Sequence, residues 1–326
     1  MAQMNMAKAI NLALFEAMER DDKVIVMGED VGPDEGVFRI TEGLYNKFGD
    51  KRVLDTPLAE SGIMGTAIGM AIYGLRPVCE MQFSGFDYYA FHQLECHASR
   101  FRNRTRGRVT VPVVMRAPYG GGIRALEHHS ESREAIYAHT PGLKVVIPSG
   151  PRNARALLHS AIQDPDPVIY YEPKAIYRLF KEDVPEAMET LPIGQAQVVR
   201  KGKDITLISY GASLRPTLEA AELLEEEDGV QAEVIDLLTI SPMDATLIIE
   251  SVKKTGRAVV VHEGPRTCGL GAEVVARINE AALLYLEAPI KRVTGFDVPI
   301  PYFSKERFFL PDPERVLAAS RETLSF

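Results

Sequence analysis

One glutamate, Glu60, stands where a carboxylate could take part in chemistry. The stretch VLDTPLAESGIMG (53–65) joins a β-branched apolar segment to a run of small residues and glycines, with Glu60 at the junction. A carboxylate there could simply offset the positive end of the dipole in the first turn of a helix. A buried carboxylic acid could instead hold a proton and pass it on. The stretch by itself leaves both interpretations open.

A second group of chemically capable residues lies in the segment APYGGGIRALEHHSESREA (117–135). Its three consecutive glycines, Gly120 to Gly122, permit backbone conformations and close approaches that other residues forbid. His128 and His129 follow, and a neutral imidazole at the start of a helix can accept or donate a proton. The alternative is a surface loop whose histidines only complete hydrogen bonds.

These residues need a scaffold, and the first half of the chain predicts a parallel sheet. Helical patterns alternate with short β-rich apolar runs at 23–30, 76–83, 111–118, 143–149 and 167–173. Continuous Val and Ile runs of this kind are typical of parallel strands that are covered on both faces. Ligands bind at the carboxyl ends of such strands. Candidate polar residues at these ends are Glu29, Asp30, Glu60 and Gln82.

A polar stretch at 181–194 interrupts this pattern, and a second α/β series follows it. Its β-rich runs lie at 204–211, 232–237, 257–264 and 290–297, and polar residues at their ends include His262 and Glu263. We therefore predict the α/β fold class with two α/β domains, one spanning residues 1–185 and the other residues 195–326.

The composition excludes several classes of protein. The chain has 326 residues, 46% of them hydrophobic and 25% charged, which suits two soluble globular domains. Its formal net charge of -8 argues against nucleic acid as the main partner. The three cysteines are far apart and form no CxxC motif, which suits a reducing compartment. Without a span-length apolar run or a signal peptide, we expect a cytoplasmic protein with no membrane contact.

Several longer motifs resemble those of one family, in the same order along the chain. Among them are MGEDVG (27–32), DTPLAESGI (55–63), EHHSES (127–132) and DPVIYYEPK (166–174). The chain resembles the beta subunit of the thiamin-diphosphate-dependent 2-oxo acid dehydrogenases, the decarboxylating component of those multienzyme complexes. The resemblance covers essentially the whole chain. It implies a pyrimidine-binding domain with a mainly parallel sheet, followed by a transketolase-type C-terminal domain.

The resemblance also implies roles for single residues. The family's glutamate that matches Glu60 contacts the aminopyrimidine ring of thiamin diphosphate and shares a proton with it, which activates the cofactor. Leu58, Gln82 and Phe86 match residues that line the pyrimidine pocket.

Of the two histidines, His129 matches the catalytic one, because it directly precedes Ser130 as in the family's HS pair. By this resemblance His129 would transfer protons and hand the acyl unit to a lipoyl group. His128 stands at a position where the family varies.

A missing motif implies a partner. Single-chain thiamin enzymes carry a GDG motif and a later pair of asparagines that hold the metal and the diphosphate, whereas this chain has FGDK (48–51) and no Asn-Asn. A diphosphate is costly to bind without cationic or dipolar groups. The resemblance therefore implies an alpha subunit that holds Mg²⁺ and the diphosphate, in an α2β2 heterotetramer. Some members also hold a potassium ion, largely through backbone carbonyls, and the matching residues are Val111, Val113, Ala161 and Asp164.

Substrate and docking complete the expectations from the family. IYYEPKAIYR (169–178) and EHHSES look most like branched-chain members, so we expect a branched-chain 2-oxo acid, with pyruvate and acetoin as alternatives. A non-catalytic assembly scaffold is a separate alternative. Many members dock through the C-terminal domain onto a lipoyl acyltransferase core by means of a small basic domain. Carboxylates of the acidic chain that suit this contact are those of Glu287, Glu322 and the terminal Phe326.

Overall fold

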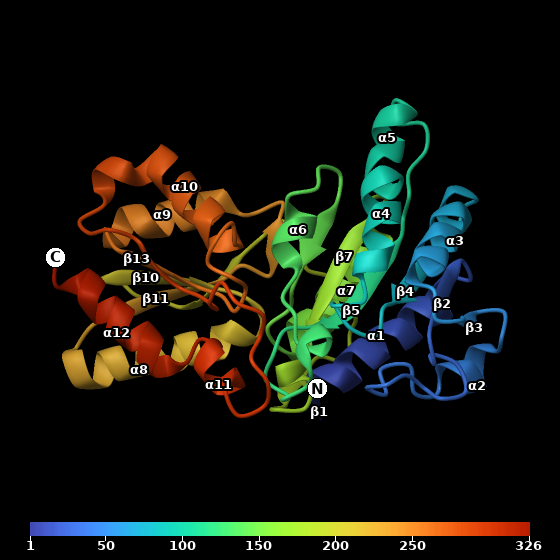
Figure 1. Ribbon diagram of the computed structural model, residues 1–326, viewed down its shortest axis with the longest axis horizontal. Coiled ribbons are helices and arrows are strands. Elements are labelled where there is room, and N and C mark those ends of the chain that lie inside the picture. Colours follow the sequence, from blue (N-terminus) through green and yellow to red (C-terminus); the bar gives the residue numbers. More distant parts are fainter.

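The computed structural model describes all 326 residues, and two α/β blocks lie side by side in it (Figure 1). The first block contains a seven-stranded sheet. Its strands, in spatial order, are β12 (Thr239–Ser241), β6 (Lys144–Val146), β7 (Val168–Pro173), β5 (Val114–Tyr119), β4 (Arg76–Glu80), β2 (Val24–Gly28) and β3 (Val53–Asp55). All of them are parallel except β12, which pairs antiparallel with β6.

The second block contains a five-stranded sheet. Its strands, in spatial order, are β14 (Lys291–Val293), β13 (Ala258–Val261), β10 (Ile205–Ser209), β11 (Ala232–Asp236) and β9 (Gln197–Arg200). Only β9, at one edge, is antiparallel to its neighbour. A separate ribbon pairs β1 (Ala2–Met4) with β8 (Glu182–Val184). The predicted fold class, two α/β domains with mainly parallel sheets, is confirmed.

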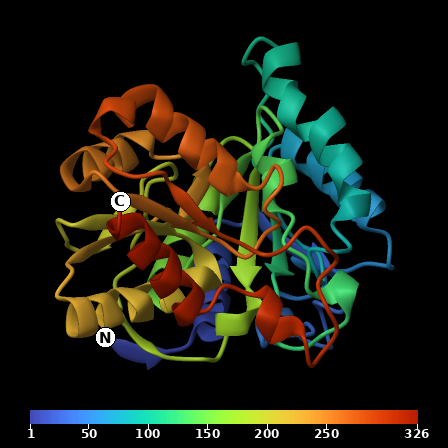
Figure 2. The same cartoon turned by 60° about the vertical axis from the view of Figure 1, so that its left-hand side comes forward.

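Helices cover both faces of the first sheet. On one face α1 (Met6–Arg20) packs against α7 (Pro151–Gln163), and both bury their apolar residues in one cluster with β2 and β7. On the other face lie α3 (Glu60–Ile72) and α4 (Tyr88–Cys96). The shorter helices of this block are α2 (Leu44–Phe48), α5 (Phe101–Arg104) and α6 (Glu134–Ala138). Helices α4 and α5 form an arm that projects beyond the body of the molecule (Figures 1 and 2).

The second sheet is covered in the same way. Helices α8 (Leu214–Asp228) and α12 (Pro313–Leu324) pack together on one face, while α9 (Ala245–Thr255) and α10 (Leu270–Ala282) pack together on the other. A short helix, α11 (Glu306–Phe309), precedes α12. No helix in the fold combines the length and the apolarity that a membrane crossing requires.

The two blocks share one hydrophobic core. A single cluster of 35 buried residues includes Met64 of α3 and Leu94 of α4 in the first block, and Ile248 of α9 and Val274 of α10 in the second. The first sheet is also completed by β12, a strand from the second half of the chain. The relative position of the two blocks is therefore set by apolar packing as well as by strand pairing.

A buried ion cluster ties the middle strands of the first sheet together. Arg116 on β5 donates from Nε to Glu172 on β7 at 2.7 Å and also pairs with Glu80 at the end of β4. None of these three side chains is more than 3% exposed. Breaking such a buried pair typically costs about 3–5 kcal/mol because the remaining charge has no partner. The cluster therefore helps to fix β4, β5 and β7 relative to one another.

Candidate active site

Polar residues that follow the parallel strands gather at the carboxyl edge of the first sheet. Glu29 and Asp30 follow β2, Glu60 comes shortly after β3, and Gln82 follows β4. Gln82 Nε2 donates to Asp30 Oδ2 at 2.7 Å, which joins the ends of two neighbouring strands. This edge is where parallel α/β sheets bind their ligands.

Glu60 is both the first residue of α3 and a buried residue. It is only 6% exposed, and the residue that precedes it, Ala59, has no side chain that could cap the helix. The free amides of the first helical turn are therefore close to a carboxylate. The two interpretations of Glu60 are compatible, because it is a first-turn acid that has also been withdrawn from water.

A second carboxyl, that of Glu29, is buried in the field of Glu60. Glu29 is 7% exposed, and its Oε1 has no hydrogen-bond partner on the chain. Burial, followed by the negative charges of Glu60 and Asp30, raises the pKa of Glu29 to about 7. Glu29 can therefore hold a proton near neutral pH, which limits the negative charge that Glu60 faces.

His129 lies between two aromatic rings. Its ring centroid is 4.4 Å from that of Phe83 and 5.2 Å from that of Phe86, and its Nδ1 is buried without a partner on the chain. Burial, with smaller contributions from the charges of Lys174 and His128, lowers the pKa of His129. The neutral imidazole, which can accept a proton, is therefore favoured at neutral pH.

The neighbouring histidine lies in a different environment. His128 is exposed, and its Nδ1 is 3.7 Å from Oε1 of Glu131. The two imidazoles are therefore not equivalent: His129 packs on aromatic rings beside buried groups, whereas His128 faces solvent.

The residues expected to line a pyrimidine pocket differ in exposure. Gln82 and Phe86 are half-buried, whereas the side chain of Leu58 is 79% exposed. All three lie in the loops after β3 and β4, on the same edge as Glu60. These residues thus share one edge of the sheet with Glu60.

Residues of the second domain also contact the loop that carries His129, and the sequence did not predict these contacts. The loop that carries His129 borders a cavity of about 420 Å³, which Glu263 and Phe309 of the second block also line. Ser132 Oγ donates to Glu263 Oε1 at 3.0 Å. Glu263 was a candidate only as a polar residue at a strand end, and Glu306, which also contacts the loop, lies in no recognisable motif.

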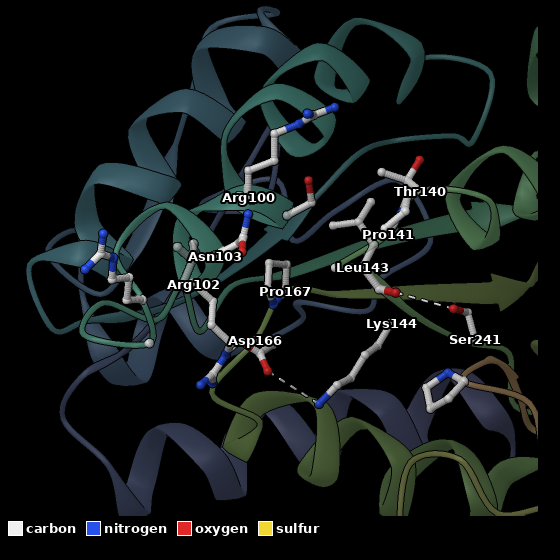
Figure 3. Close-up of a pocket in the computed structure, with 17 residues that line it drawn as sticks. Arg100, Arg102, Asn103, Thr140, Pro141, Leu143, Lys144, Asp166, Pro167 and Ser241 are labelled. Atoms are coloured by element: carbon white, nitrogen blue, oxygen red, sulfur yellow. Dashed lines mark hydrogen bonds and ion pairs between the residues drawn. The ribbon is translucent and has the colours of Figure 1, made fainter.

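The residues that match a potassium site already have partners within the chain. Lys144 Nζ lies 2.8 and 2.7 Å from the two carboxylate oxygens of Asp164, and the carbonyl of Val111 accepts from the amide of Val113 at 2.8 Å. Lys144 reaches Asp166 as well, at the rim of a cavity of about 880 Å³ at the amino ends of β6 and β7 (Figure 3). A potassium ion here stays a prediction. No group of three or more His, Cys, Asp or Glu side chains is arranged to hold a metal ion.

Comparisons with known proteins cover both blocks. Residues 2–179 match the family described as transketolase, pyrimidine binding domain, and residues 194–316 match transketolase, C-terminal domain. The chain is 50% identical over 322 residues to the pyruvate dehydrogenase E1 component subunit beta of Acholeplasma laidlawii, covering 99% of this chain and 98% of that one. It is 51% identical over 326 residues to the protein of the same name from Staphylococcus epidermidis, with complete coverage of both chains.

A solved structure supports the fold. A chain described as a split gene transketolase, inactive beta4 tetramer, superposes with a TM-score of 0.80 and covers 99% of both chains at 24% identity. At that level of identity the likeness concerns the architecture alone.

The buried carboxyl of Glu29 gives a first prediction. Between pH 4.5 and about 7 the unfolded chain loses this proton while the folded chain keeps it, so Glu29 lowers the stability as the pH rises. Glu29→Gln removes this loss. The unfolding free energy of the variant, relative to the unsubstituted chain, should rise by on the order of 1 kcal/mol between pH 5 and pH 8. Thermal unfolding over this range measures it, with Asp34→Asn on the same loop as the exposed control; a difference that does not change with pH would contradict it.

Proposed function

Since the chain belongs to the family of pyruvate dehydrogenase E1 component beta subunits, within the thiamin-diphosphate-dependent 2-oxo acid dehydrogenases, we propose that it acts on pyruvate. The identity of about 50% to the named relatives, over essentially the full length of both chains, carries this proposal. The branched-chain substrate that we expected first is not the one that these names support; they support the alternative. In the proposed reaction pyruvate is decarboxylated and its acetyl unit passes to a lipoyl group.

A packing observation weakens one of the two motifs behind the branched-chain expectation, IYYEPKAIYR. The segment 169–178 forms most of β7 and the turn after it, and Tyr170 and Tyr171 are fully buried there. Tyr170 donates to the carbonyl of Ala154 at 2.7 Å, and Tyr171 donates to Asp87 at 2.6 Å. Both side chains are therefore engaged in the core, where they cannot contact a substrate.

The carboxyl edge of the first sheet fits the pyrimidine half of thiamin diphosphate. Two buried polar atoms without a partner on the chain, Glu29 Oε1 and His129 Nδ1, lie there, as do the half-buried Gln82 and Phe86. When bound, the cofactor supplies the electron sink that decarboxylation of a 2-oxo acid requires. Glu60 would share a proton with a ring nitrogen of the cofactor. Glu29, whose pKa is raised to about 7, would when protonated keep a second negative charge away from Glu60.

We assign His129 to proton transfer and to the handover of the acyl unit to the lipoyl group. Its lowered pKa keeps the imidazole neutral, so that Nδ1 or Nε2 can accept a proton. Phe83 and Phe86 hold the ring in place and exclude water from one side of it. The exposed His128 has no such support.

An alpha subunit would complete the site. The chain has neither the GDG motif nor the asparagine pair that hold the metal and diphosphate in single-chain thiamin enzymes, so we assign Mg²⁺ and the diphosphate to that partner in an α2β2 heterotetramer. Docking onto a lipoyl acyltransferase core through the C-terminal domain is part of the same proposal. Of the three expected contact residues, Glu322 pairs with Lys291, and Glu287 pairs with Arg257, whereas Phe326 is 66% exposed.

The substrate is tested by reconstitution with the alpha partner, Mg²⁺ and thiamin diphosphate. We expect kcat/KM for pyruvate to exceed that for 2-oxoisovalerate by about tenfold or more. A pocket that fits the methyl group of pyruvate would be strained by the larger isopropyl group of 2-oxoisovalerate. The chain without its partner is the control and should show no turnover. A preference for 2-oxoisovalerate would restore the branched-chain interpretation, and no cofactor-dependent turnover at all would support the scaffold.

Glu60→Gln tests the proton role of the buried acid. Gln keeps the shape of the side chain but cannot share the proton, so we expect the hydrogen–deuterium exchange rate at the thiazolium carbon of the bound cofactor to fall by about 10²–10⁴-fold. The heterotetramer should still assemble. Glu42→Gln, an exposed glutamate of the same domain, is the matched control. An exchange rate close to that of the unsubstituted enzyme would reject the assignment of Glu60.

Comparing His129→Ala with His128→Ala tests the choice of histidine. Removal of the half-buried ring between Phe83 and Phe86 should slow acylation of a lipoyl domain by about 10²-fold or more, whereas removal of the exposed ring should cost less than about threefold. Single-turnover acylation of an isolated lipoyl domain measures both. Equal losses, or a larger loss for His128→Ala, would show that the wrong ring was chosen.

A further inference from the structure

A carboxylate of the second domain holds the loop that carries His129. Glu306, the first residue of α11, is 3% exposed and accepts two backbone hydrogen bonds from that loop. Its Oε1 accepts from the amide of Gly122 at 2.8 Å, and its Oε2 accepts from the amide of Arg124 at 2.9 Å. Each oxygen of the carboxylate therefore fixes one backbone position in a loop about 180 residues earlier in the chain.

The three consecutive glycines make this contact sterically feasible. Gly122 has a φ of +95°, and a Cβ there would lie 2.6 Å from the Cβ of Ala175. A Cβ on Gly121 would lie 3.1 Å from Oε1 of Glu306. A side chain at Gly121 would push the loop away from Glu306, and one at Gly122 would clash with Ala175 of the first domain. The glycines thus bring the loop backbone to protein carboxylates.

Two further contacts bracket the histidine. The hydroxyl of Tyr302 donates to Oε2 of Glu127 at 3.2 Å, on one side of His129, and Ser132 donates to the buried Glu263 on the other side. Within the loop, the amide of His129 donates to the carbonyl of Leu126 at 2.9 Å. A tight turn therefore connects His129 to the segment 122–124, which Glu306 holds, so that a backbone shift at Arg124 also moves His129.

We propose that Glu306 is a positioning residue that sets the location of the His129 imidazole through the backbone amides of Gly122 and Arg124, an inference that rests on the role proposed for His129. A buried carboxylate that accepts two amide hydrogen bonds makes charge-assisted contacts, which are stronger than neutral ones. Truncating it frees two amides and the loop together. Errors of about 1 Å in the placement of a reacting group can cost up to about 10²-fold in rate.

The test uses the reconstituted holoenzyme and single-turnover acylation of a lipoyl domain. Glu306→Ala should lower kcat for acylation about tenfold while KM for the lipoyl domain changes less than about twofold. Glu306→Gln keeps an oxygen that can accept one of the two amides and should recover most of the rate. In the His129→Ala background, Glu306→Ala should cost little more, because both changes act on the same imidazole.

Controls separate this inference from the proposed function. Lys305→Ala, exposed and next to Glu306, should leave the rate unchanged. If His129→Ala has no effect on acylation, the proposed function fails. If His129→Ala is impaired while Glu306→Ala is not, or if their losses multiply, only the positioning role is overturned. Should Glu306→Ala fail to assemble, Glu306→Gln removes one of the two amide contacts and should lower kcat about two- to threefold; an unchanged rate would overturn the proposal.

Discussion

The withdrawal of two carboxyl groups from water at one sheet edge is the constraint on which the rest of the structure depends. Glu29 and Glu60 come from loops after neighbouring parallel strands, and both are less than 10% exposed. Burying two carboxyl groups that repel each other costs free energy: burial, followed by the charges of Glu60 and Asp30, raises the pKa of Glu29 to about 7, so that Glu29 is partly protonated at neutral pH. The sheet can impose this cost because its middle strands are fixed by the buried Arg116 cluster and by helices on both faces.

Much of the scaffold follows from local sequence, and the remainder depends on contacts between distant segments. The strands β2, β5 and β7 lie in short β-rich runs of the sequence and are buried along their whole length, and they were therefore predictable. The strands β9 and β12 have only four and three residues and are defined by their partners. Strand β12 in particular pairs with β6, nearly a hundred residues earlier, so no periodicity could place it in the first sheet.

The candidate site divides in the same way. Glu60 was singled out because it stands where a strand gives way to a helix, and His129 because the resemblance matches it, before Ser130, to the family's catalytic histidine; the roles of both stay predictions. The coupling of Glu29 to Glu60 was not, because the two residues are 31 positions apart and meet only through the pairing of β2 with β3. Glu306 gave no signal at all: it begins a four-residue helix, and its partners are backbone amides, which any sequence supplies.

Buried polar atoms without a partner on the chain gather at the carboxyl edges of both sheets. In the first sheet they belong to loops after β2, β3 and β5, and include atoms of Glu29, Thr56 and His129. In the second sheet they lie at the ends of β10, β11 and β13, in Ser209, Asp236 and His262. Native folds leave few such groups, because each costs about 1–3 kcal/mol.

The loop that carries His129 crosses from the first edge to Glu263, just beyond β13, so the two edges meet around it. Ordered water or a bound group can satisfy such atoms, and this agrees with the proposed site that a cofactor and a partner subunit would share.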